Sequence, residues 1–288
     1  MQNTILKLSD KLPLTCSRVG TCCHGNKVML NPWELAYMAN GKKISTSKFR
    51  ALYTEWCGVR LLFNGAAGYN GKPACSQYAE GTGCSIHTSR PLVCRLFPLG
   101  RQIQNGVTAY MHQSQQFPCL DACPEVLNLP YFSVEEYLTG QETVKWELAQ
   151  NSYLELVQLL ADIAFELLLD SGLAASGDKE TLQQWRLMAD ESAEQLSTRI
   201  GTEWLDHLTI PELELNTEQP QLFCEQHSLL LQQELQTNLE NAQTIKELQD
   251  AAALVMALAL LLAVAVGVEP RLLASHWIDI AKSNGAQE

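Results

Sequence analysis

The spacing of apolar residues separates a regular second part of the chain from an irregular first part. From 142 to 170, apolar residues recur every three to four positions, which is typical of an amphipathic helix. Similar patterns predict helices near 180–208 and 219–240, and a last helix beginning at Pro270, because proline fits a first helical turn. Ser133 and Glu136 have capping-box spacing and predict a short helix before these. We therefore expect a helical bundle.

One segment of the second part allows two interpretations. Residues 251–268, "AAALVMALALLLAVAVGV", form an uncharged run of 18 residues, the lower limit for a membrane span. Its flanks are acidic (Glu247, Asp250 and Glu269), and no Lys/Arg cluster at either end would fix an orientation in a membrane. Its many alanines would also let neighbouring helices approach closely. We expect a buried central helix of the bundle rather than a membrane span.

The first part of the chain predicts shorter elements. In "NPWELAYMANG", Asn31 as cap, Pro32 at the first position, Glu34 at the capping-box position and Gly41 past the end predict a short helix. A second helix is expected from Ser47 to about Trp56. The dipeptide at 105–106, Asn-Gly, between two β-prone runs is a strong hairpin signal. The expected fold is mainly α (α+β): a small cysteine-rich domain at 1–140 with short helices and a β-hairpin, then an acidic α-helical domain at 141–288.

Charge divides the chain near the same place. Of the net charge of −12, residues up to 125 contribute +7 and the remainder −19. The basic part could attract nucleic acid, an anionic cofactor or an acidic partner, or it could simply balance buried thiolates and the acidic half. The start of the chain lacks the continuous apolar run of a signal peptide, so we expect a cytoplasmic protein.

Ten cysteines are the strongest chemical signal, and nine of them precede residue 124. In a reducing compartment they favour metal ligation or reactive thiols over disulfides. The chain has no CxxC pair and no CxxxCxxC triplet, which argues against zinc ribbons, thioredoxin-type pairs and radical S-adenosylmethionine enzymes. The adjacent Cys22 and Cys23 diverge too much to share one tetrahedral zinc easily. An iron–sulfur cluster is therefore favoured, or two sites, with zinc as the alternative.

The cysteine-bearing motifs resemble a known family. "CSRVGTCC", "GTGCSIHTSRPLVCRLFP" and "CLDACP", within 14 to about 140, look like the YkgJ-type cysteine-cluster family, a zinc- or iron-chelating domain related to flagellin lysine N-methylases. The most specific element, "RPLVCRLFP", matches the family's RPxxCRxFP. The resemblance implies that the metal ligands are Cys16, Cys22, Cys23, Cys75, Cys84, Cys94, Cys119 and Cys123.

The chain departs from the family at one ligand position, and other side chains near the cysteines have expected roles. Val19 stands where the family's CxxCxxCC opening has its second cysteine, so either Cys57 substitutes or the site uses one ligand fewer. Arg90 and Arg95 flank Cys94 and are expected to bind the cofactor, by neutralising buried thiolates or by gripping a cofactor carboxylate. Two histidines receive secondary roles: a packing residue beside the site, His87, and an exposed loop residue, His24.

Three functions remain open. The favoured one is a metal-cluster-binding protein with a structural or redox role, whose acidic half docks a protein partner. The resemblance implies the second, transfer of a methyl group from S-adenosylmethionine to a protein lysine, but the chain lacks a Gly-rich loop after a strand and no catalytic residue can be named. The third, a zinc-stabilised nucleic-acid-binding module, lacks a basic run interleaved with aromatics.

Overall fold

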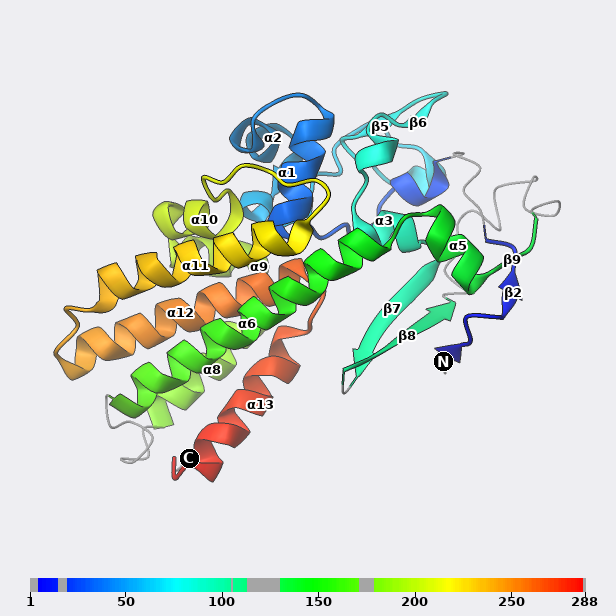
Figure 1. Ribbon diagram of the computed structural model, residues 1–288. Coiled ribbons are helices and arrows are strands. Elements are labelled where there is room, and N and C mark those ends of the chain that lie inside the picture. Colours follow the sequence, from blue (N-terminus) through cyan, green and yellow to red (C-terminus); the bar gives the residue numbers. More distant parts are fainter. Residues whose placement is uncertain (1–4, 15–19, 105, 113–129, 171–178, 287–288) are drawn as a thin grey trace.

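A computed structural model describes the chain except for residues 1–4, 15–19, 105, 113–129, 171–178 and 287–288 (Figure 1). The described residues form eleven α-helices and several small antiparallel sheets. The expected mainly α fold with a minor β component is therefore confirmed. The short, irregular elements gather at one end of the molecule, and the long helices form the other (Figure 1).

The long helices follow the apolar pattern closely. They are α5 (Val134–Gly140), α6 (Val144–Asp170), α8 (Lys179–Asp190), α9 (Ala193–Ile200), α10 (Thr202–Thr209), α11 (Pro220–Leu239), α12 (Ile245–Ala265) and α13 (Pro270–Ser283). The capping box at Ser133 and Glu136 forms, and Pro270 occupies the first turn of α13, both as predicted. The predicted 180–208 region is three helices, because Ser192 caps a new helix and Gly201, with φ +82°, interrupts the next.

Helix α12 lies inside the bundle, where it packs against α6, α8, α9 and α13 (Figure 1). Every residue from Val255 to Ala263 is buried. This helix is long and apolar enough to cross a membrane by length and composition, but two-thirds of its most apolar stretch is buried inside the protein (67%). A core helix passes the same test of composition. The predicted central helix is thus found in the core.

Short helices and strands build the cysteine-rich end. The helices are the 3₁₀ helices η1 (Thr21–Cys23), η2 (Trp56–Gly58), η3 (Tyr69–Gly71) and η4 (His87–Ser89), and α1 (Pro32–Gly41), α2 (Thr46–Tyr53) and α3 (Leu92–Leu96). The strands are β1 (Ile5–Leu6), β2 (Lys11–Leu12), β3 (Thr54–Glu55), β4 (Arg60–Leu61), β5 (Tyr78–Ala79), β6 (Gly83–Cys84), β7 (Leu99–Gln104), β8 (Val107–His112) and β9 (Phe132–Ser133).

The predicted hairpin and the two predicted short helices are all present. Strands β7 and β8 pair from Gln104↔Val107 to Leu99↔His112, and β1 adds to β8, giving the order β1-β8-β7. Helix α1 has the predicted capping box, although Gly41 is its last residue rather than the residue after it. Helix α2 begins one residue earlier than predicted, because Ser45 caps it, and ends at Tyr53, where β3 begins.

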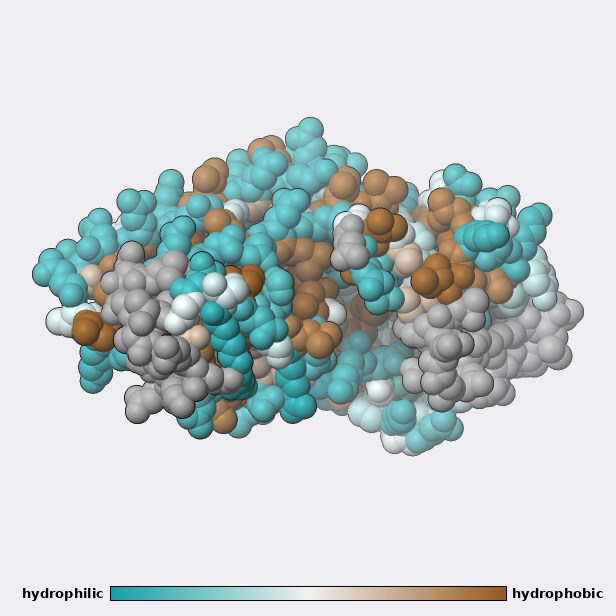
Figure 2. Space-filling model, turned by 90° about the horizontal axis from the view of Figure 1, so that it is seen from below, coloured by the Kyte–Doolittle hydropathy of each residue, from teal (hydrophilic) through white to brown (hydrophobic). Residues whose placement is uncertain are grey.

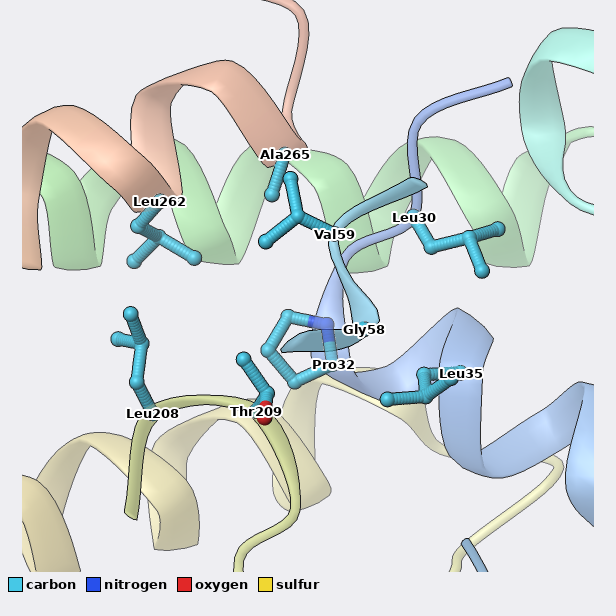
Figure 3. Close-up of a pocket in the computed structure, with 9 residues that line it drawn as sticks. All are labelled: Leu30, Pro32, Leu35, Gly58, Val59, Leu208, Thr209, Leu262 and Ala265. Carbon is cyan, nitrogen blue, oxygen red and sulfur yellow. The ribbon is translucent and has the colours of Figure 1, made fainter. Parts of the chain in front are cut away.

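One hydrophobic core runs through both ends of the molecule. Trp33 of α1 packs edge-on against Trp146 of α6, with 5.5 Å between their ring centroids. Polar contacts also join the two ends: Arg50 forms an ion pair with Asp206 at 2.6 Å. Where they meet, α1 and η2 face α10 and α12 across an apolar void of about 10 Å³, room for about one water molecule (Figure 3).

A second, smaller core lies entirely within the cysteine-rich end. Its buried members are Val28, Leu30, Leu35, Met38, Ala39, Phe49, Leu61 and Ile86. Cys75, Cys84 and Cys94 pack against it. The cysteines therefore sit on the edge of a hydrophobic core, which holds the segments that carry them.

Candidate metal centre

A cavity of about 270 Å³ lies between η1, the β4–β6 region and α3. Five thiols from four separate segments line it: Cys22, Cys23, Cys75, Cys84 and Cys94. All five are partly exposed. The fold thus brings together every predicted metal ligand that lies within the described residues. The other three predicted ligands, Cys16, Cys119 and Cys123, lie outside them.

Backbone hydrogen bonds bring the first two cysteine segments together. The Cys75 N–H donates to the Cys23 carbonyl at 2.7 Å, which joins η1 to the second segment. Gly20 precedes η1 with φ +82°, and a Cβ there would lie 2.3 Å from the ring of Tyr78, so only glycine fits. Tyr78 in turn pairs with Cys84 across β5 and β6. The local fold therefore places four of the five thiols without any side-chain cross-link between them.

Helix α3 presents the fifth thiol, that of Cys94, and a buried carboxylate holds this helix. Glu34 Oε1 accepts a hydrogen bond from the Leu92 N–H at 2.7 Å, and Oε2 accepts one from the Asn31 N–H at 3.1 Å. Burial raises the pKa of Glu34 to about 7, although both hydrogen bonds oppose that rise. The sequence predicted only the capping role of Glu34, because its second partner lies 58 residues away.

The thiols share one electrostatic environment. Burial raises the pKa of Cys94 well above its usual value, the neighbouring Cys75, Cys22 and Cys84 raise it further, and Arg90 opposes them. Burial also raises the pKa of Cys75 to about 11, although the Gln77 N–H lies 3.5 Å from its sulfur and stabilises the thiolate. These two thiols are protonated at neutral pH, so a metal cation that binds them must displace protons.

The two arginines beside Cys94 have different surroundings. Arg90 lines the cavity, and its Nη1 donates to the His87 carbonyl at 2.6 Å while Nη2 bonds to the side chain of Gln141. Arg95 is not among the cavity-lining residues, and its guanidinium bonds to backbone carbonyls instead. The structure therefore brings Arg90, but not Arg95, to the thiols.

Cys57 and the two histidines also differ in their placement. Cys57 is exposed, has φ +54°, and is not among the cavity-lining residues. His24 was predicted to be exposed, which is wrong: it is only 9% exposed, and its Nδ1 lies 2.9 Å from the Gly20 carbonyl oxygen. Its ring packs against Tyr78 because η1 folds back onto that segment. His87 lines the cavity next to Arg90.

The described residues suit a soft metal by their chemistry, but they do not converge on one point. Thiolates are the ligands that zinc and iron–sulfur clusters prefer. The sulfurs around a single tetrahedral zinc would lie about 3.8 Å apart, given Zn–S bonds of about 2.3 Å. In the described part of the chain, no three His, Cys, Asp or Glu side chains lie close enough together to hold one ion. The five thiols instead surround a wider space.

Comparison with known proteins supports metal binding by this end of the chain. Residues 15–119 match the family model CxxCxxCC, described as a putative zinc- or iron-chelating domain. The match includes all five cavity cysteines and confirms the resemblance found in the sequence motifs over this segment. No curated protein and no solved structure matches the chain.

Proposed function

We propose that the cysteine-rich end binds an iron–sulfur cluster, which has a structural or redox role. The observation that carries this proposal is the gathering of five thiols from four segments around one cavity of about 270 Å³. The segment that supplies them matches a zinc- or iron-chelating domain. Cys22, Cys23, Cys75, Cys84 and Cys94 would hold the group, and the resemblance adds Cys16, Cys119 and Cys123.

A cluster suits this site better than a single zinc ion for two reasons. The cavity is many times larger than the 10–15 Å³ or so that one water-sized occupant needs. The five thiols in the described part of the chain also line its walls, and no three of them lie close enough together to hold one ion. A cluster that is bound by thiolates supplies cross-linking of the loops and one-electron chemistry.

The chain's own residues support such a group in two ways. Arg90 places a positive charge at the cavity, where it favours the thiolate form of Cys94. Apolar side chains, including Met38, Phe63 and Phe97, form other parts of the wall. Charge compensation and the apolar shell around a site are means by which proteins tune metal sites.

The remaining parts of the proposal concern the setting of the site. A reducing cytoplasm would keep cysteines as thiols and available to a metal. Residues 126–288 carry a net charge of −19 and offer a surface for a protein partner with a basic face.

Anaerobic purification followed by iron, sulfide and zinc analysis tests the proposal. We expect equal amounts of iron and sulfide, and a broad visible absorption band that bleaches on reduction. Stoichiometric zinc in a colourless protein would replace the cluster with a zinc site. Absence of all three elements, together with failure to take up iron and sulfide in reconstitution, would reject a metal-binding function.

A protein lysine N-methyltransferase is the alternative that the family resemblance implies. The observation that favours it is the size of the cavity, which has room for an organic group beside Arg90. Calorimetry with S-adenosylmethionine on metal-loaded protein separates the two functions. Micromolar binding would favour the methyltransferase, and no detectable binding would remove it.

A further inference from the structure

The side chain of Arg95 hydrogen-bonds to the turn that leads into α3. Its Nε donates to the Arg90 carbonyl at 3.0 Å, and Nη2 donates to the Thr88 carbonyl. Its Nη1 donates to the Gln141 carbonyl at 2.7 Å, at the end of α5. One guanidinium therefore joins two carbonyls of the cysteine-bearing turn to the helical half.

Packing fixes the plane of this guanidinium. Its carbon lies 3.4 Å from the ring centroid of Trp146, and the Arg95 side chain is only 3% exposed. Trp146, on α6, is itself buried and packs against Trp33 of α1. Burial lowers the pKa of Arg95 to about 10, so the group stays charged at neutral pH. The nearest carboxylate, that of Glu142, is exposed and 3.8 Å away, too far for a hydrogen bond.

Helix α3 is also held from another side. The Leu92 N–H, in its first turn, donates to the buried carboxylate of Glu34 on α1. Cys94 lies between these two attachments and directs its thiol into the cavity with the other four. Neither attachment uses a cysteine.

We infer that Arg95 is a positioning residue for the metal centre: it fixes the turn that presents Cys94 and does so without touching the cavity. The inference rests on the proposed metal-binding function. A metal site requires its ligands to be held within about 0.5 Å of the productive geometry. Lysine could keep the charge at this position, but it could not span three carbonyls in one plane while it stacks on an indole.

The test compares Arg95→Lys with a matched control, Arg101→Lys, in the full-length protein. Arg101 is another arginine of the same end, its side chain is 5% exposed, and it joins strand β7 to Gln150 and Asn151 of α6. Its described hydrogen bonds and ion pair go to Thr108, Glu147, Gln150 and Asn151, away from the cysteine-bearing turn. Zn²⁺ affinity of the metal-free protein is measured by competition with a chromogenic chelator, under conditions in which circular dichroism shows both variants to be folded.

We expect Arg95→Lys to lower the Zn²⁺ affinity by roughly 10- to 100-fold, the range found for residues that support metal ligands, and Arg101→Lys to leave it nearly unchanged. Alkylation of metal-free protein, followed by mass spectrometry, should show faster labelling of Cys94 relative to Cys75 in Arg95→Lys only. Unchanged affinity in Arg95→Lys, or an equal loss in both variants, would overturn the inference.

Three further outcomes keep the result interpretable. If Arg95→Lys does not fold, Trp146→Phe takes its place, because it keeps an aromatic platform of smaller area. We then expect Trp146→Phe to lower the Zn²⁺ affinity by less than the loss expected for Arg95→Lys. An unchanged Zn²⁺ affinity in Trp146→Phe would overturn the inference. If the wild-type protein takes up iron and sulfide but no Zn²⁺, the variants are compared by cluster content after reconstitution, and equal content in wild type and Arg95→Lys would overturn the inference. If it binds neither Zn²⁺ nor iron, the proposed function fails, and the positioning role fails with it.

Discussion

The thiols of Cys94 and Cys57 have opposite surroundings. Cys94 lines the cavity with four other thiols, whereas Cys57 is exposed and outside it. We therefore predict that Cys94→Ser loses most of the bound metal and that Cys57→Ser retains it, as measured by metal content per protein after anaerobic purification. Equal loss in both variants would show that Cys57 substitutes for the ligand missing at Val19.

His227 makes the stability of the helical half sensitive to acid. It is fully buried, accepts a hydrogen bond from Tyr153 at Nδ1 (3.0 Å), and donates from Nε2 to the His207 carbonyl (2.8 Å). Burial lowers the pKa of His227 to about 4. The folded protein therefore keeps this ring neutral, whereas the unfolded chain binds a proton below about pH 6.5. The free energy of unfolding should therefore fall as the pH drops from about 6.5 towards about 4.

The size of this effect can be isolated with His227→Gln. Between pH 7 and pH 5 we expect the wild type to lose roughly 2 kcal/mol more unfolding free energy than the variant, as measured by urea denaturation. The comparison with the variant is needed because Glu34 has its pKa raised to about 7 in the folded protein. Protonation of Glu34 therefore raises the free energy of unfolding over part of the same pH range. Parallel pH profiles for the two proteins would contradict the prediction.

At the scale of single residues, the sequence identified the thiols but not what holds them. The cysteine motifs and the family resemblance selected eight residues, and the fold gathers the five of them that lie within the described residues. The motif also drew attention to Arg95, but its charge is directed at Thr88, Arg90 and Gln141 rather than at sulfur. The position of Gln141 relative to Arg95 depends on how two distant segments pack. No local pattern contains that information.

At the scale of elements, the packing of α1 on η4 predicts that a glycine-to-alanine substitution in a helix lowers stability instead of raising it. Gly41 ends α1, and a Cβ there would lie 2.3 Å from Oγ and 2.7 Å from Cβ of the buried Ser89. Alanine normally stabilises a helix by about 0.5–1 kcal/mol relative to glycine. Here we expect Gly41→Ala to destabilise the protein by about 1–3 kcal/mol, because the added methyl group overpacks the contact.

Gly140 offers the matched control for this prediction. It ends α5, is exposed, and an added Cβ would meet nothing within 4 Å. Gly140→Ala should therefore leave the melting temperature unchanged or raise it slightly, while Gly41→Ala lowers it. If both variants melt alike, then α1 and η4 are not packed as closely as described.

Elements were predictable where their signals are local. The caps at Asn31 and Ser133 and the turn at Gly106 act within four residues, and each forms as expected. The division of 180–208 into three helices was not resolved, because the apolar spacing continues across Ser192 and Gly201. The interruption depends on where neighbouring helices leave room for a turn.

At the scale of the whole molecule, the continuity of the main core predicts cooperative unfolding. Trp33 and Leu92 from the cysteine-rich end belong to the same buried cluster as Trp146 and Leu258 from the helices. The division at residue 140 stays a prediction about sequence character. We expect the loss of helical signal and the exposure of cavity thiols to occur at the same denaturant concentration. Thiols that become reactive well before the helices melt would indicate two separate units.

The underside of the molecule carries mixed hydrophilic and hydrophobic side chains, with apolar residues gathered towards its middle (Figure 2). Apolar side chains that remain more than half exposed include Val107 at the hairpin and Leu272 on α13. Single exposed apolar side chains such as these are ordinary for a folded surface. Residues Val255 to Ala263 of α12, in contrast, are all buried by neighbouring elements.

The position of α12 along the chain has a consequence for synthesis. A ribosome makes residues 245–265 after α6, α8 and α9, the helices that cover most of this segment. The most apolar helix therefore leaves the exit tunnel after the helices that will cover it have been synthesised. This order shortens the time during which α12 is exposed to aggregation or to the membrane-insertion machinery. A circular permutant that begins at α12 would reverse that order, and its soluble yield in cells should drop although its native contacts are the same.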